Sequence, residues 1–216
     1  VESVTVTRYS LKDSSGVLSR SKSFKFFCYN FNESGDVTER VQYTSDGTLQ
    51  WKYKYDTKGN NTEEAMYYSN GSLREKSTYK YDTKGNKIEA AWYYSDGSLR
   101  GKHTFKYDTK GNNTEDASYN SNGSLNDKKI YKYDRKGNNT EYAVYNSDGS
   151  LRNKKICKYD TKGNKTEEAR YASDGLKHKL TYKYDSQGNI TELTECYAYM
   201  QIPESHVFTY TIIYRK

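Results

Sequence analysis

The sequence has little proline, little sulfur and no long apolar run. Its 216 residues include one Pro, two Met and three Cys. A transmembrane helix needs about 20 consecutive apolar residues, and no such run is present. There is no signal peptide either, and the chain begins at Val1 rather than Met, so we expect a processed or cut form of a longer chain. Absence of a targeting segment therefore says nothing about export.

The cysteines do not suggest a disulfide framework. Cys28 belongs to an irregular N-terminal segment. In the strand register argued below, Cys157 and Cys196 are three strands apart, roughly 14 Å, which is too far for a disulfide. We expect three free thiols, so the fold does not depend on a bridge.

Aliphatic residues are scarce, and the mean hydropathy of −1.16 is typical of a disordered chain. Two observations oppose disorder. Aromatic residues make up 15% of the sequence, and 25 residues are Tyr, placed at regular intervals. The net charge of +7 comes from 35 basic and 28 acidic residues with mixed signs, which indicates a solvated surface rather than a basic arm.

A 26-residue unit recurs along the chain. Its anchor, Tyr-Asp-x-x-Gly-Asn, occurs at residues 55–60, 81–86, 107–112, 133–138 and 159–164, and one residue early at 184–189. Half a unit later comes Tyr-Ser-Asn/Asp-Gly-Ser-Leu, at 68–73 and 94–99, with related segments at 120–125 and 146–151. A fixed period of this length predicts an array in which each unit packs against its neighbours.

Both motifs predict β-turns with Gly in the fourth position, a type I turn followed by a left-handed Gly. The segments between them are rich in aromatic and β-branched residues and alternate with period two. We predict an all-β fold, an antiparallel β-meander of about 16 strands built from hairpin repeats. The predicted turn glycines are Gly59, Gly71, Gly85, Gly97, Gly111, Gly123, Gly137, Gly149, Gly163 and Gly188.

The predicted register pairs Tyr81 with Lys87 and Tyr79 with Glu89 in one hairpin, and Tyr93 with Leu99 in the next. It gives a single aromatic face that also carries a Glu set, from Glu39 to Glu192, and a small-residue set, from Val41 to Ala169. The rings expected on this face are Tyr53, Tyr55, Tyr79, Tyr81, Tyr93, Phe105, Tyr107, Tyr119, Tyr131, Tyr133, Tyr145, Tyr159, Tyr171, Tyr182 and Tyr184. The opposite face is expected to contact a partner through Met66, Trp92, Val144, Lys80, Lys106 and Lys132.

The ends of the chain depart from the repeat. We expect N-terminal cap strands at 1–31 around a turn at 13–16, hairpin repeats at 32–197, and a C-terminal cap at 198–216 with a strand at 207–214. A flat sheet with one aromatic face buries little. It can coil until that face lines an interior, stay a single layer, or dimerise face to face. Because strands twist, we favour an elongated, twisted or spiralling sheet.

The anchor in the form Tyr-x-Tyr-Asp-x-x-Gly-Asn, as at 79–86, resembles the YD repeats of RHS-type proteins over residues from about 25 to 197. This resemblance implies a bacterial, secreted or surface-associated protein whose hairpins wind into a shell or spiral, in some members around a toxin domain. The chain has a longer unit and no toxin-like tail. The Tyr-Gly hairpins are also similar to MORN-type repeats, which form scaffolds. The segment at 91–99 is similar to glucan-binding repeats, but those carry a Trp in nearly every copy and this chain has two.

No catalytic constellation is apparent, and we expect no enzyme, no metal and no cofactor. The three histidines, His103, His178 and His206, are scattered without metal-ligand spacing. Adjacent carboxylates such as Glu63 and Glu64 point to opposite faces of a strand. A four-residue turn offers too few oxygens for calcium. The Asn-Gly-Ser sequons at 70–72 and 122–124 fit glycosylation, but Asn-Gly is also a turn requirement. Nucleic acid is not expected, because no coherent basic stripe emerges.

Three functions remain open. The first is a structural or interaction module of an exported bacterial protein, extracellular, on the cell surface or periplasmic, which binds a protein partner. The second is a carbohydrate- or cell-wall-binding module that uses Tyr rings as stacking surfaces. The third is an RHS-type shell segment that encloses a polypeptide.

Overall fold

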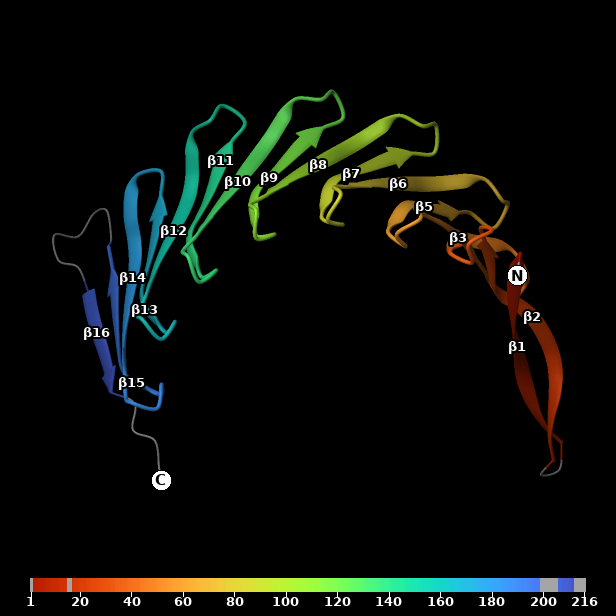
Figure 1. The fold of residues 1–216 in the computed structure, drawn as a ribbon, viewed down its shortest axis with the longest axis horizontal. Helices are drawn as coiled ribbons and strands as arrows, with labels where there is room; N and C mark the ends of the chain where they lie inside the picture. The colour runs from red at the N-terminus through yellow and green to blue at the C-terminus, as the bar shows by residue number, and fades with distance from the viewer. Residues whose placement is uncertain (1, 15–16, 199–205, 212–216) are drawn as a thin grey trace. The chain divides into compact units, whose positions relative to one another are not determined.

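The computed structural model describes residues 2–14, 17–198 and 206–211. These residues form strands and turns, with no helix. The sheet has sixteen strands, and their order follows the chain from β1 to β16 (Figure 1). The predicted all-β meander of hairpins is therefore confirmed. The predicted turn at 13–16 and the C-terminal features at 198–216 lie partly outside the described residues.

The strands are β1 Ser3–Ser14, β2 Val17–Phe31, β3 Val37–Tyr43, β4 Leu49–Tyr55, β5 Asn61–Tyr67, β6 Leu73–Tyr81, β7 Lys87–Tyr94, β8 Leu99–Tyr107, β9 Asn113–Asn120, β10 Leu125–Tyr133, β11 Asn139–Asn146, β12 Leu151–Tyr159, β13 Lys165–Ala172, β14 Gly175–Tyr184, β15 Ile190–Tyr197 and β16 His206–Thr211.

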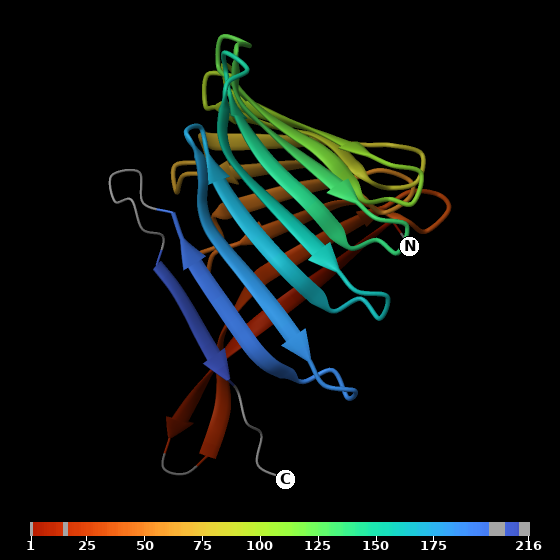
Figure 2. The ribbon, with the colours of Figure 1, turned by 90° about the vertical axis from the view of Figure 1, so that its left-hand side faces the viewer.

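The chain divides into two compact units. Unit 1 comprises Val1–Thr104 and Tyr119–Gly123, and unit 2 comprises Phe105–Ser118 and Ser124–Lys216. Inside each unit, among the described residues, the strands in contact are neighbours along the chain, and they pair antiparallel. Figure 2 shows this for the blue strands of unit 2, which run side by side in alternating directions. Each unit is thus a single layer of sheet.

The Tyr-Asp-x-x-Gly-Asn turn is held by its aspartate. In the copy at 81–86, the Asp82 carboxylate accepts hydrogen bonds from the backbone N of Lys84 (2.9 Å), the backbone N of Asn86 (2.8 Å) and the Asn86 side-chain Nδ2 (2.9 Å). The bond from the Asn86 side chain is the main cause that lowers the pKa of Asp82. Gly85 has a φ of 87°, a left-handed conformation that Gly adopts without steric cost. The same bonds recur around Asp56, Asp108, Asp134, Asp160 and Asp185.

The second turn uses a shorter version of the same device. In the copy at 94–97, the Asp96 carboxylate accepts bonds from the backbone N of Ser98 (2.8 Å) and from its hydroxyl (2.6 Å). The hydroxyl bond is the main cause that lowers the pKa of Asp96. All ten glycines predicted for the two kinds of turn have positive φ.

The register differs from the prediction by one residue beyond each turn. Tyr81 pairs with Lys87, and Tyr93 with Leu99, as predicted. A register shift follows at once in both hairpins, because one residue on the far strand has no partner: Ile88 in the first and Arg100 in the second. Such an unpaired residue is a β-bulge. After it, Glu89 lies opposite Lys80 rather than opposite Tyr79.

A slip of one residue moves every later side chain to the other face of the sheet. Tyr79 and Tyr81 therefore share a face with Trp92, which we call the variable face. Glu89, Ala91 and Tyr93 join Lys80 on the opposite face, which we call the ladder face. The same assignment of residues to the two faces holds in unit 2, where Lys132 pairs with Glu141 and Lys158 pairs with Glu167.

The predicted single aromatic face is therefore wrong, because it was built without the bulges. Tyr93, Tyr119, Tyr145 and Tyr171 lie on the ladder face. The Lys76 ammonium lies 5.4 Å from the centre of the Tyr93 ring, and Lys102 lies 5.2 Å from that of Tyr119. Of the rings predicted for the single face, those that lie on the variable face are Tyr53, Tyr55, Tyr79, Tyr81, Phe105, Tyr107, Tyr131, Tyr133, Tyr159, Tyr182 and Tyr184.

The predicted partner-facing set is also split by the register. Met66, Trp92 and Val144 lie on the variable face. Lys80, Lys106 and Lys132 lie on the ladder face, opposite Glu89, Glu115 and Glu141. Val144 is only 4% exposed, so its side chain contributes little surface.

The most buried side chains are small. Among the described residues, no large side chain is fully buried, and most of the buried apolar positions are alanines. On the ladder face these are Ala65, Ala91, Ala117, Ala143 and Ala169, between 0% and 3% exposed. Most aromatic rings are half-buried. Burial of large apolar side chains therefore contributes less here than in a two-layer domain, and the polar contacts described next carry more of the stability.

Candidate binding face

The ladder face repeats one set of contacts. In unit 1, the Glu89 carboxylate lies 2.8 Å from the Lys80 ammonium and 3.7 Å from that of Lys102. In unit 2, Glu141 lies between Lys132 (3.1 Å) and Lys154 (3.3 Å). The hydrogen bond from Lys80 lowers the pKa of Glu89, and the same bond raises the pKa of Lys80. The lysines are thus neutralised locally.

The positions that repeat on this face are Lys54, Lys80, Lys106, Lys132, Lys158 and Lys183; Glu63, Glu89, Glu115, Glu141, Glu167 and Glu192; Ala65, Ala91, Ala117, Ala143 and Ala169; Tyr67, Tyr93, Tyr119, Tyr145 and Tyr171; and Lys76, Lys102, Lys128, Lys154 and Lys179.

The centre of the variable face differs from repeat to repeat. In unit 1, five residues lie opposite one another across neighbouring strands from β4 to β8: Tyr53, Glu64, Ser77, Trp92 and Gly101. They share neither size nor charge. The side chains at the centre of the variable face therefore differ from strand to strand, whereas those on the ladder face of the same strands repeat.

The equivalent positions that vary are Trp51, Ser77, His103, Lys129, Lys155 and Leu180; Glu64, Ala90, Asp116, Tyr142, Glu168 and Leu193; Met66, Trp92, Ser118, Val144, Arg170 and Glu195; and Glu75, Gly101, Asp127, Asn153 and His178.

The anchor tyrosines of the variable face have a structural role. The Tyr81 hydroxyl donates a hydrogen bond to the backbone carbonyl of Asn61 (2.8 Å), in the preceding repeat. Asn61 is the first residue of β5 and lies at the bulge of its hairpin, where ladder pairing is interrupted. Tyr133, Tyr159 and Tyr184 make the equivalent bond to Asn113, Asn139 and Lys165. These rings are therefore part of the repeat framework.

Lysines in the turns add a second link between repeats. Lys58 donates from its ammonium to the backbone carbonyl of Thr83 (2.8 Å), 25 residues further along the chain. Lys110 makes the same bond to Arg135 (2.6 Å), and Lys162 to Ser186 (3.3 Å). These turn lysines thus hydrogen-bond to the equivalent turn of the next repeat.

A hollow of about 320 Å³ lies in unit 1, and most of its lining side chains are on the variable face. Its lining includes the rings of Trp51, Tyr79 and Trp92. Polar groups come from Glu64, Glu75, Ser77 and Arg100. It is the place on this face where aromatic and charged side chains converge. From the sequence, Trp92 was predicted to face a partner and Trp51 was given no role, because the predicted register did not bring the two residues together.

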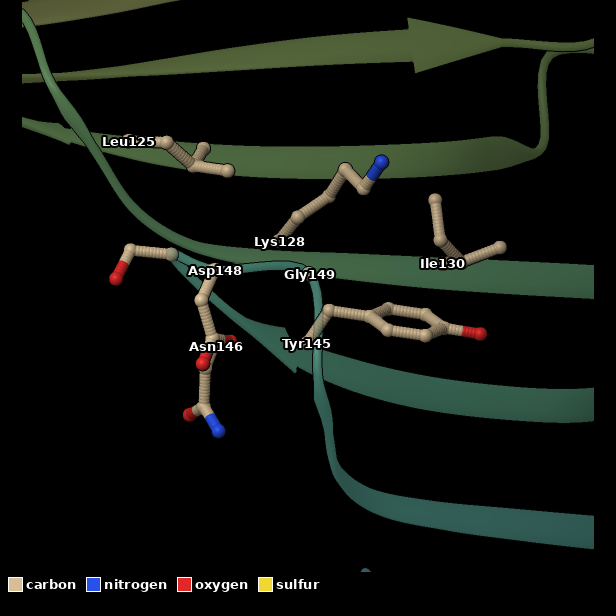
Figure 3. A pocket seen from close by; sticks show the side chains of 8 residues that line it. Leu125, Lys128, Ile130, Tyr145, Asn146, Asp148 and Gly149 are labelled. Atoms are coloured by element: carbon tan, nitrogen blue, oxygen red, sulfur yellow. The ribbon is translucent and has the colours of Figure 1, made fainter.

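A second depression, of about 500 Å³, lies in unit 2 beside the turn at 146–149, which is equivalent to the turn at 94–97. Figure 3 shows its lining: Lys128 and Ile130 from β10, Tyr145 from β11, and Asp148 and Gly149 from the turn. Lys128 and Tyr145 lie directly opposite each other in the register. Both occupy uniform ladder-face positions, so this depression is a product of the repeat rather than a distinctive site.

One polar cluster was not foreseen. His178, on β14, lies opposite Tyr197, on β15, and their rings stack with centroids 4.5 Å apart. The Glu195 carboxylate accepts bonds from the Tyr197 hydroxyl (2.6 Å) and lies 2.7 Å from Nε2 of His178. The Tyr197 bond is the main cause that lowers the pKa of Glu195. The predicted repeats place these residues on facing strands of one hairpin, but only the register with the bulge sets His178 opposite Tyr197.

The described residues contain no group of three or more His, Cys, Asp or Glu side chains arranged to bind a metal ion. Cys28, Cys157 and Cys196 are free thiols, and Cys157 is buried in the position that Tyr or Phe occupies in other repeats. The described part of the chain also holds no helix with the length and apolar character needed to cross a membrane.

Comparison with known proteins gave distant structural similarities, including two to Bacteroides proteins. No protein-family model matches the sequence, and no curated protein matches it. One similar solved structure is a porin-like protein from Bacteroides uniformis, with 13% identity, a TM-score of 0.39, and coverage of 85% of this chain and 86% of that one. Another is a protein of unknown function from Bacteroides fragilis, with 11% identity, a TM-score of 0.17, and coverage of 86% and 91%.

Proposed function

We propose that this chain is a non-enzymatic binding module of an exported bacterial protein, and that its variable face contacts a protein partner. The single observation that carries the proposal is the asymmetry between the two faces. On the ladder face, five sets of equivalent positions keep the same residue type, Lys, Glu, Ala, Tyr and again Lys, in successive repeats. On the variable face, four sets of equivalent positions change size, polarity and charge.

A purely structural sheet has no need of this asymmetry. Both faces of a single layer meet the same requirement for solubility and strand pairing, so a framework role alone favours uniform repeats on both sides. Irregular chemistry displayed on a regular framework is the arrangement that lets a repeat protein match one particular partner. The exported bacterial setting rests on the resemblance of the anchor motif to YD repeats.

Site-specific photo-crosslinking in the producing cells tests this proposal. A photoreactive phenylalanine analogue is introduced on the variable face in place of Met66, Trp92 or Arg170. Matched controls carry it on the ladder face in place of Thr78, Thr104 or Ile130. We expect one discrete adduct from the variable-face positions, competed away by an excess of the unmodified chain. Adducts of equal yield from both faces, or none from either, would refute the proposal.

A further inference from the structure

We propose that the hollow in unit 1 is a binding site for a neutral glycan, with the rings of Trp51 and Trp92 as its stacking surfaces. The site lies on the variable face, but the inference does not depend on the protein partner proposed above. It rests on three properties of the hollow: the space beside its rings, the hydrogen-bonding groups near them, and the balance of its charges.

The first property is the space beside Trp92. Its neighbour across the strand pair on one side is Ser77, and its neighbour on the other side is Gly101. These are among the smallest side chains that the variable face carries. Trp51 lies on β4 and Trp92 on β7, so three strand spacings, about 14 Å, separate their backbones. Ser77 on β6 lies between the two rings, and Gly101 on β8 lies beyond Trp92, so neither strand neighbour of Trp92 fills the space beside its ring, where the hollow of about 320 Å³ lies.

The rings themselves suit a sugar. A pyranose presents a flat face of C–H groups, and this face packs on an aromatic ring, while the indole N–H remains available as a hydrogen-bond donor. Tyr79 and Tyr93 also line the hollow, but the Lys76 ammonium lies beside the Tyr93 ring, and Tyr79 is partnered as well. The Lys87 ammonium lies 4.1 Å from the centre of the Tyr79 ring, and the Tyr79 hydroxyl donates to Glu64 (3.1 Å).

Trp51 stacks on Tyr53 with ring centres 6.0 Å apart, and Trp92 meets His103 at a right angle with ring centres 5.3 Å apart. An indole ring has two faces, so one neighbouring ring leaves each tryptophan a face for a sugar, and we assign the stacking to these two faces.

The second property is a set of positioned polar groups. Glu64 accepts bonds from the Asn61 side-chain amide (2.6 Å) and from the Tyr79 hydroxyl (3.1 Å), one on each oxygen. These bonds fix the carboxylate, and each of its oxygens keeps a further lone pair. Glu75 and Arg100 lie 3.9 Å apart, which is beyond hydrogen-bond distance. Their remaining acceptor and donor capacity suits sugar hydroxyls, which both donate and accept.

The third property selects against charged ligands. The lining contains two acidic residues, Glu64 and Glu75, and two basic residues, Lys76 and Arg100. A sulfated or phosphorylated ligand would face both carboxylates, and a cationic ligand would face both basic groups. Since the formal charges cancel, neither sign is favoured, and a neutral polyhydroxylated ligand uses the donors and acceptors together.

The chain offers its own reporter for this site, because Trp51 and Trp92 are its only two tryptophans. Intrinsic fluorescence of the purified chain therefore reads the hollow directly. The probes are neutral tetrasaccharides of glucose, galactose, mannose and N-acetylglucosamine, titrated to millimolar concentration. A heparin tetrasaccharide and a trilysine peptide represent the two charged classes. Calorimetry supplies a second readout of binding.

Variants can be chosen from the repeats themselves. Trp92→Ser places in β7 the residue that Ser118 supplies at the equivalent position of β9, and Glu64→Ala copies Ala90. Both changes reproduce residues that the sheet already accommodates, and circular dichroism verifies the fold. Val144→Ser makes a similar change at the equivalent position of β11, outside the hollow.

We expect at least one neutral tetrasaccharide to change the fluorescence in a saturable way. Trp92→Ser and Glu64→Ala should each weaken its binding on the order of tenfold, as loss of a central contact does, whereas Val144→Ser should not. The inference is overturned if no neutral sugar binds, if a charged probe binds more tightly, or if Trp92→Ser binds as well as the unmodified chain. The titration requires no cellular partner, so it can fail while the crosslinking succeeds, and the reverse.

Discussion

Adjacent residues of one strand show how differently the two faces are used. Ala90 and Ala91 are both buried, with 4% and 1% exposed. On the ladder face, the position equivalent to Ala91 holds Ala in all five consecutive repeats from Ala65 to Ala169. On the variable face, the position of Ala90 holds Glu64, Asp116 or Tyr142 instead. The ladder face thus holds one residue type at this position, whereas the variable face holds several.

On the ladder face, side chains of successive repeats pack against one another. The buried alanines lie among Lys, Glu and Tyr side chains that make the same contacts in successive hairpins. A larger residue there would displace an ion pair or a ring. The variable side is constrained in this way only near the anchor turns, where the tyrosine hydroxyls bond to backbone carbonyls, and it leaves the strand centres free to diverge.

Paired substitutions of the two alanines give the strongest test of this contrast. Ala91→Tyr overpacks the ladder face, and we expect it to lower the free energy of unfolding by about 1–3 kcal/mol. Ala90→Tyr copies Tyr142, whose ring centre lies 5.2 Å from that of Tyr131, so it should cost less than about 1 kcal/mol. Urea unfolding followed by circular dichroism measures both. Equal losses would show that the two faces do not differ in this way.

Tyr81→Phe tests the framework part of the variable face. It removes the hydroxyl that bonds to the Asn61 carbonyl, and we expect a loss of about 1 kcal/mol in the free energy of unfolding. Tyr94→Phe is the matched control, because Tyr94 lies at a turn and is 51% exposed. If the two variants unfold at the same urea concentration, the link between repeats contributes no net stability.

The smallest effect is expected from the ladder ion pairs, and it depends on pH. The pKa of Glu89 is lower in the folded chain than in the unfolded one. Its stabilisation is therefore complete above its unfolded-state pKa of 4.5 and is lost as the pH falls through its folded-state value. The closer partner, Lys80, has a side chain that is 68% exposed, so Glu89→Gln should cost at most about 1 kcal/mol at pH 7.

In acid, that difference should disappear, since the carboxylate is then protonated in the unmodified chain as well. Free energies of unfolding measured from pH 7 down to the acid limit of folding provide the check. Glu75→Gln serves as the control, because the Glu75 carboxylate lies 3.9 Å from the Arg100 guanidinium, which is beyond hydrogen-bond distance. A penalty for Glu89→Gln that stays constant with pH would contradict an ionic origin.

Local features were predictable from the sequence because each is encoded by a few neighbouring residues. Asp82 and Gly85 define their turn, and the alternation between turns defines the strands. The first pair beyond each turn, Tyr81 with Lys87 and Tyr93 with Leu99, was also predicted correctly. These features require no knowledge of what lies across the strand.

The faces could not be predicted in the same way, because they depend on a single unpaired residue. Ile88 carries no sequence mark of a bulge, and omitting it transferred Glu89 and Tyr93 to the wrong side. A usable signal was nevertheless present. Lys80 and Glu89 recur together in each full repeat with opposite charges, as cross-strand partners do. Neither the hollow at Trp51 and Trp92 nor the His178 cluster could be located until that register was correct.

The hydrogen bonds from Tyr81 to Asn61 and from Lys58 to Thr83 span only one repeat length. Cooperativity in such a chain passes from each hairpin to the next, as in a one-dimensional lattice, and folding can nucleate in any interior hairpin. Duplication or loss of one 26-residue cassette in the gene then leaves the contacts of the turns and of the ladder face with equivalent partners. Chain length becomes an evolutionary variable that is nearly independent of fold integrity, and new binding chemistry can be added one cassette at a time.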